Sequence, residues 1–159
     1  MCPIPHTDSN HPRHRLQIPH STQMRLSPHF TYEELTRTSV KGDNTPTKQS
    51  LINLVRLCFH ILEPAREIYG KPIFINSGYR SFFVNQAVGG VVNSAHCSGR
   101  AADLRVENSE QGRLLFNAIK DLPWVDQLLF EIKGKTLWIH VAWNENPRHQ
   151  IHPNYPVRG

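Results

Sequence analysis

Residues 94–103 read Ser94-Ala-His96-Cys-Ser-Gly-Arg-Ala-Ala-Asp103, and they include two side chains that commonly bind metal ions, His96 and Asp103. A third such side chain, His140, lies further along the chain in the apolar run Leu-Trp-Ile-His-Val-Ala-Trp. Two imidazoles and one carboxylate are a common catalytic zinc set, because they leave the fourth tetrahedral position free for water. Glu131, in the preceding apolar run, is a candidate to accept the proton of that water. These residues together predict a site for hydrolysis.

On the amino-terminal side of this stretch, the sequence predicts helices. Thr31 and Glu34 have the spacing of a capping box, which marks the start of a short helix. Apolar residues between 51 and 68 recur at helical spacing, so one face of a longer helix is expected to be buried. Thr45, which is followed by proline, is expected to begin that helix, and Gly70 is expected to end it.

On the carboxy-terminal side, the sequence predicts strands. Two apolar runs between residues 127 and 143 form a hairpin whose turn has Gly134 as its first central residue, as in a type II′ turn. This register pairs Glu131 with Trp138, and it places Glu131 and His140 on the same face as diagonal neighbours. Helices in the first half and antiparallel strands in the second half predict an α+β fold, with helices packed on a small antiparallel sheet that carries the zinc site.

Composition divides the chain into three parts. Residues 1–25 are rich in Pro, His, Ser, Thr and Asn, and their few apolar side chains cannot offset the cost of ordering, so we expect this segment to be disordered. Residues 26–146 are expected to form one domain that carries the metal site, which suits a chain of 159 residues. Residues 147–159 are again rich in Pro, His and Asn and are expected to be an irregular tail.

The chain has a net charge of +5 and a pI near 9.4, which favours an anionic partner such as nucleic acid, a membrane surface or bacterial cell wall. Lys and Arg form no long run, so we expect no nucleic-acid partner. No apolar stretch is long enough to span a bilayer, and the N-terminus lacks the apolar centre of a secretory signal. We expect a monomer that stays in the cytoplasm until it is released or exported by another route.

Three segments together resemble a known family. They are Ser77-Gly-Tyr-Arg80, Ser94-x-His96-x-x-Gly99-x-Ala101-x-Asp103 and Trp138-Ile-His140-Val. In this pattern the chain resembles the zinc D-alanyl-D-alanine carboxypeptidases and phage endolysin peptidases, which have the hedgehog-type zinc peptidase fold. The resemblance covers roughly residues 26–143, and the second segment is the most specific of the three.

The resemblance implies a peptidase that hydrolyses peptide stems of bacterial peptidoglycan and uses one zinc ion as its cofactor. The implied zinc ligands are His96, Asp103 and His140. The zinc-bound water would attack the scissile carbonyl while Glu131 acts as the general base. Arg80 and Ser94 would contact the substrate, and the planar guanidinium of Arg80 suits a carboxylate.

Several alternatives remain open from the residues alone. Taken singly, Arg80 could form a surface ion pair, His140 could be a packed strand residue, and Glu131 could be a solvated hairpin residue. Cys97 could be a metal ligand. Several relatives carry a second histidine where this chain has Trp138, so the chain could be a zinc-stabilised binding module without turnover. Carboxypeptidase and endopeptidase activity, in phage lysis or in wall remodelling, both fit the pattern.

Overall fold

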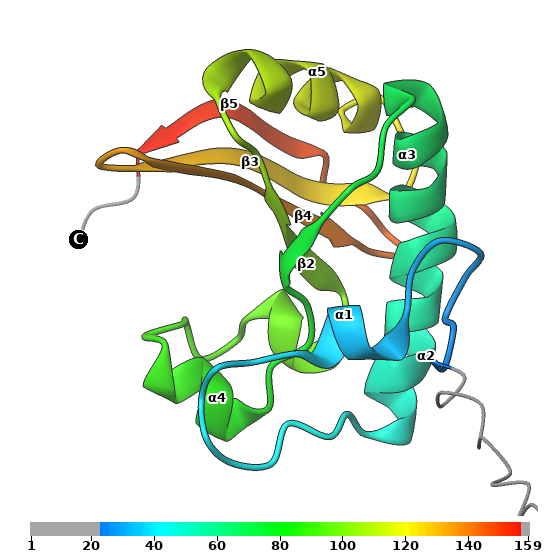
Figure 1. Ribbon diagram of the computed structural model, residues 1–159, viewed down its shortest axis with the longest axis vertical. Helices are drawn as coiled ribbons and strands as arrows, with labels where there is room; N and C mark the ends of the chain where they lie inside the picture. Colours follow the sequence, from blue (N-terminus) through cyan, green and yellow to red (C-terminus); the bar gives the residue numbers. More distant parts are fainter. Residues whose placement is uncertain (1–22, 157–159) are drawn as a thin grey trace, which may run out of the picture.

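A five-stranded sheet in the order β1-β2-β4-β3-β5 forms the centre of the fold, with helices α2, α3 and α5 packed against it (Figure 1). The computed structural model describes residues 23–156. The strands are β1 (Ile75–Ser77), β2 (Ala101–Arg105), β3 (Val125–Lys133), β4 (Thr136–Trp143) and β5 (Gln150–Pro156). The helices and single turns are α1 (Tyr32–Thr36), α2 (Lys48–Leu57), η1 (Cys58–Leu62), α3 (Glu63–Tyr69), α4 (Phe82–Ala87), η2 (Ala95–Ser98) and α5 (Ser109–Ile119). The predicted α+β class is confirmed.

The two faces of the sheet carry different kinds of residue, because side chains alternate along each strand. One face is apolar and fully buried, and it includes Ala102, Leu104, Leu128, Ile139 and Val141. The other face carries Asp103, His140 and Glu131, which pair across neighbouring strands or lie diagonally to one another. The sheet therefore separates the hydrophobic core from the polar groups of the predicted site.

The capping box at α1 is confirmed, because the Thr31 hydroxyl accepts from the Glu34 N–H and the Glu34 carboxylate accepts from the Thr31 N–H. The predicted start of the longer helix at Thr45 is wrong. Thr47 caps α2 instead, and the Thr45 N–H donates to the carboxylate of Asp43 at 2.9 Å. Thr45 therefore belongs to the turn before the helix.

The apolar stripe predicted between residues 51 and 68 is formed by α2, η1 and α3, which follow one another without a break. Its last predicted member, Ile68, is exposed, so the buried stripe ends at Ala65. η1 is a turn of π-helix that ends at Leu62, two residues before Pro64. Proline has no N–H for the helical hydrogen bond, and a wider turn accommodates that loss. Gly70 ends α3 in the left-handed conformation with φ 72°, as predicted.

The predicted hairpin register is confirmed. Glu131 pairs with Trp138 and Leu129 pairs with His140 in the antiparallel ladder of β3 and β4. Gly134 has φ 60°, whereas Lys135 is not among the residues with positive φ, which matches the type II′ turn. The turn at Gly134 and Lys135 therefore fixes the register of β3 and β4.

The carboxy-terminal segment corrects the prediction of an irregular tail over 147–159. Residues Gln150–Pro156 form β5, which pairs in parallel with β3, so the sheet is mixed and not antiparallel throughout. Arg148 holds this segment in place, because its backbone N–H and its guanidinium donate to the buried Asp126 carboxylate at 2.6–3.1 Å. Ile151 then packs against the core. Residues 1–22 and 157–159, which carry the rest of the two terminal predictions, lie outside the described residues.

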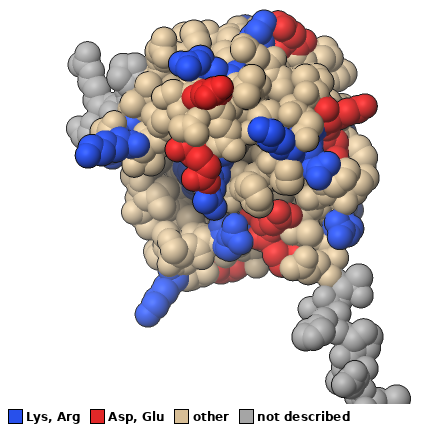
Figure 2. All heavy atoms as spheres, turned by 45° about the horizontal axis from the view of Figure 1, so that its top comes forward, with Lys and Arg blue, Asp and Glu red and all other residues tan. Residues whose placement is uncertain are grey.

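Charged side chains of both signs are interspersed on the face drawn in Figure 2, so the net positive charge is not gathered into one patch there. None of the helices formed by residues 23–156 is long and apolar enough to cross a membrane.

The turn η2 is fixed on α2 by close contacts. The side-chain amide of Asn53 donates to the Ser98 carbonyl at 2.8 Å, and the Trp143 indole N–H donates to the Asn53 carbonyl at 3.0 Å. Gly99 ends η2 with φ 73°, and a Cβ at this position would overlap the carbonyl oxygen of Ser50. Both observations require glycine, so the docking of η2 depends on Gly99.

Gly99→Ala is expected to lower the free energy of unfolding by about 3 kcal/mol or more, because the left-handed φ and the Ser50 carbonyl both oppose a methyl group. Gly70→Ala is the matched control, since Gly70 has a similar φ of 72° and no atom near the added Cβ. It should cost only about 1–2 kcal/mol. Urea unfolding of both variants measures the difference, and equal losses would show that η2 is not held by this contact.

Candidate active site

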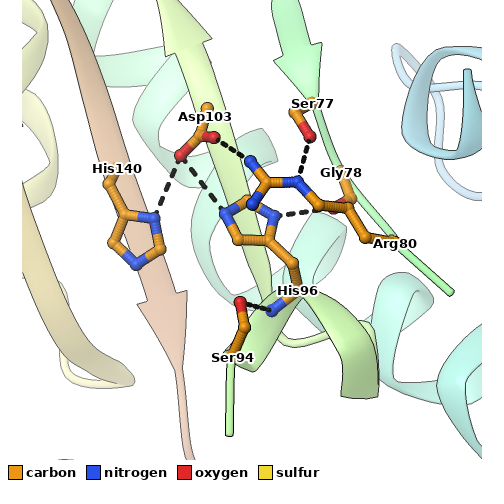
Figure 3. A network of polar contacts seen from close by, with 7 residues as sticks. All are labelled: Ser77, Gly78, Arg80, Ser94, His96, Asp103 and His140. Atoms are coloured by element: carbon orange, nitrogen blue, oxygen red, sulfur yellow. Dashed lines mark hydrogen bonds and ion pairs between the residues drawn. The ribbon is translucent and has the colours of Figure 1, made fainter. Parts of the chain in front are cut away.

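Three potential metal ligands come together on the open face of the sheet (Figure 3). Asp103 of β2 and His140 of β4 are directly paired in adjacent strands, and His96 approaches them from η2. Asp103 Oδ1 lies 3.0 Å from His140 Nδ1 and 3.3 Å from His96 Nε2. Within residues 23–156, this is the one group of three or more such side chains that could hold a metal ion.

The donor set fits zinc. Zinc binds imidazole nitrogen and carboxylate oxygen at about 2.0–2.2 Å, so two of its ligand atoms in tetrahedral geometry lie about 3.3 Å apart. The separations of 3.0 and 3.3 Å are close to this value. Three protein ligands leave one position for water or substrate, which is the arrangement of catalytic zinc sites.

His96 is oriented by a backbone carbonyl. Its Nδ1 lies 2.7 Å from the carbonyl oxygen of Gly78, which can only accept, so Nδ1 carries the proton and Nε2 is left free to bind metal. Gly78 packs so closely on α1 that a Cβ there would overlap the carbonyl oxygen of Leu35. Gly78 lies within the segment Ser77-Gly-Tyr-Arg80, but no local pattern there reveals that its carbonyl holds the ring of His96.

Arg80 lies against the other oxygen of Asp103. Its Nη2 donates to Asp103 Oδ2 at 2.7 Å, and its Nε donates to the Ser77 hydroxyl at 2.9 Å. Burial alone would raise the pKa of Asp103, but the charges and hydrogen bonds of His96 and His140 hold it well below its usual range. The carboxylate is therefore ionised, and Arg80 supports a potential metal ligand in addition to any contact with substrate.

Glu131 lies on the same face, on the strand beyond His140, and it is half-buried. Burial raises the pKa of Glu131 above its ordinary value. The charge of Asp103 acts in the same direction, whereas His140, a hydrogen bond from Trp138 and the charge of Arg80 lower the pKa. Because the charges of Asp103, His140 and Arg80 act on it, the Glu131 carboxylate is electrostatically part of the site.

Ser94 is the N-cap of η2, and its hydroxyl accepts from the His96 N–H at 3.3 Å. This contact shapes the turn, and the substrate contact expected for Ser94 stays a prediction. The thiol of Cys97 is not among the atoms that converge on the metal position, so the alternative in which Cys97 is a ligand loses its support.

A His-Asp-His set on the open face of an α+β sheet, with a carboxylate beside it, is the arrangement expected of a catalytic zinc site. Residues 28–142 match the profile of peptidase M15, and the chain belongs to this family. The chain is also 35% identical over 77 residues to the zinc D-Ala-D-Ala carboxypeptidase of Streptomyces albus G. The aligned region covers 47% of this chain and 30% of that relative. The match to a peptidase family makes the protein a zinc metallopeptidase. The predicted family is confirmed.

We expect one zinc ion per chain by elemental analysis of metal-replete protein. Chelation should lower the thermal unfolding temperature, and added zinc should restore it, because metal binding is coupled to folding. His140→Ala should weaken zinc binding by more than the roughly 10- to 100-fold that loss of an outer-sphere partner costs. His149→Ala, an imidazole outside the ligand set, serves as the control. A zinc content in His140→Ala equal to that of the control would contradict the assignment.

Proposed function

We propose that this protein hydrolyses peptide stems of bacterial peptidoglycan at a D-alanyl-D-alanine end, as a carboxypeptidase. The observation that carries the proposal is the Glu131 carboxylate on the same face as the His-Asp-His set. The printed name of the Streptomyces albus G relative supports the choice of bond. The net charge of +5 suits an anionic wall polymer.

Glu131 is the residue proposed to transfer protons. When bound, zinc lowers the pKa of water to about 7 and polarises a carbonyl group. Glu131 accepts the proton of the attacking water and then donates it to the leaving amine. A pKa raised by burial brings the carboxyl group closer to the working pH, and this suits both steps.

Arg80 is proposed to bind the carboxylate at the C-terminus of the substrate. A guanidinium has five N–H groups, and within the protein Arg80 donates one hydrogen bond to Asp103 and one to Ser77. The remaining N–H groups are available to a carboxylate of the substrate. The hydrogen bonds to Asp103 and Ser77 fix the plane of the guanidinium group. Ser94 is proposed as a second substrate contact because it adjoins His96 at the start of η2.

Digestion of purified peptidoglycan tests the proposal directly. A carboxypeptidase releases free D-alanine and shortens each stem by one residue, whereas an endopeptidase produces new amino termini within the wall. Mass spectrometry of the fragments distinguishes the two reactions. A zinc-loaded protein that binds stem peptides but releases no fragment would be the binding module that the sequence left open.

Glu131→Gln should keep zinc and the thermal unfolding temperature but lose turnover by on the order of 10² or more, because the amide cannot accept the proton. In the wild type, kcat/KM should rise with pH through the pKa of Glu131, since only the ionised form is a base. Burial raises that pKa, so the rise of kcat/KM should have its midpoint at a pH above the ordinary glutamate pKa of about 4.3. Glu107→Gln, a substitution at an exposed glutamate, is the control. Near-normal hydrolysis by Glu131→Gln would remove Glu131 from the mechanism.

Arg80→Lys should lower kcat/KM on the order of tenfold or more while the protein stays folded, because lysine keeps the charge but loses the planar fork. The loss should appear mainly in KM. Amidation of the substrate's C-terminus should weaken binding to the wild type but have little further effect on the variant, since the two changes remove the same contact. If the effects of Arg80→Lys and of substrate amidation were additive, the C-terminal carboxylate of the substrate would not be bound by Arg80.

A further inference from the structure

Two side chains of β5 lie on the same face of the sheet as the metal ligands. In the parallel ladder, His152 pairs with Leu129 and Tyr155 pairs with Glu131. The register shift between these two pairs is a bulge in β5, which lets both residues face the same side. Their rings lie 5.8 Å apart, and 42% of Tyr155 is exposed. Neither residue belongs to the His-Asp-His set.

The position of Arg80 gives the substrate a direction. Arg80 follows β1 and contacts Asp103 of β2, whereas β5 is at the opposite edge of the sheet, beyond β4 and β3. A peptide with its carboxylate at Arg80 and its scissile carbonyl at the ligands must extend its amino-terminal part away from Arg80. That part runs towards β3 and β5.

Strand spacing gives the length of peptide that reaches β5. Neighbouring strands are about 4.8 Å apart, so β5 lies about 10 Å from β4, which carries His140. An extended chain advances about 3.3 Å per residue. About three residues on the amino side of the scissile bond therefore reach His152 and Tyr155.

We propose that Tyr155 and His152 form a subsite for the peptide two to three residues on the amino side of the scissile bond, so that stem-length peptides are preferred over shorter ones. The proposal rests on the proposed function. The ring of Tyr155 offers an apolar surface and its hydroxyl both donates and accepts, while the imidazole of His152 does the same at its edge. These groups suit the amides and side chains of an extended peptide.

The test compares two substrates, an N-acetylated D-Ala-D-Ala dipeptide and a five-residue stem peptide that ends in the same two residues. Tyr155→Ala and His152→Ala should each lower kcat/KM for the five-residue peptide roughly 3- to 10-fold, chiefly through KM. The value for the dipeptide should stay unchanged. Phe59→Ala is the matched control, because Phe59 is 54% exposed and lies on η1, away from β5. Zinc content and thermal unfolding are measured for every variant.

Equal losses on both substrates, or no loss on either, would overturn the subsite. A wild-type protein that hydrolyses neither peptide would instead refute the proposed function. The subsite is then tested alone by isothermal titration calorimetry of the five-residue peptide with zinc-loaded protein. Weaker binding by Tyr155→Ala than by Phe59→Ala would support it, and equal binding would overturn it.

Discussion

The carboxylate of Asp103 connects the segments that build the site. Its Oδ1 faces His96 and His140, and its Oδ2 accepts from Arg80, so contacts from η2, β4 and the segment after β1 meet on one side chain of β2. A buried charge is costly unless it is paired and hydrogen-bonded. Here the Arg80 guanidinium donates to Oδ2 and the two imidazoles lie against Oδ1, and the carboxylate in turn offsets the positive charge of Arg80. Loss of Asp103 would therefore disturb the geometry of the other groups, whether or not metal is bound.

Two glycines place His96 at that carboxylate. At Gly78 and at Gly99, the backbone carbonyl of a helix occupies the space that a Cβ would need, so the segment after β1 and the end of η2 lie directly against α1 and α2. The carbonyl of Gly78 then fixes the imidazole and its tautomer. The imidazole of His96 is thus held from two sides by rigid backbone, which is the condition for a preorganised metal site. Gly78 and Gly99 are therefore needed because they let the backbone around His96 pack closely on α1 and α2.

Features that depend on local chemistry could be predicted from the sequence, and features that depend on distant contacts could not. The capping box of Thr31 and the hairpin register set by Gly134 were correct, because a few neighbouring residues determine each of them. The helix start at Thr45 was wrong because a second threonine, Thr47, caps α2 by accepting from the Ser50 N–H. β5 was missed because the pairing of Arg148 with Asp126 aligns a Pro- and His-rich segment, and no local pattern reveals that contact. The convergence of His96, Asp103 and His140 was predicted through the motif, whereas the link from Asp103 to Arg80 was not.

The presence of Trp138, where several relatives carry a histidine, has a physical consequence for the site. Trp138 pairs with Glu131 across the strands, and its hydrogen bond acts against the effect of burial on the pKa of that carboxyl group. An indole N–H can donate a hydrogen bond as a histidine can, but it does not ionise near neutral pH. The substitution therefore keeps a donor beside the metal site and removes a titrating group. Tryptophan at this position therefore does not by itself indicate a module without turnover.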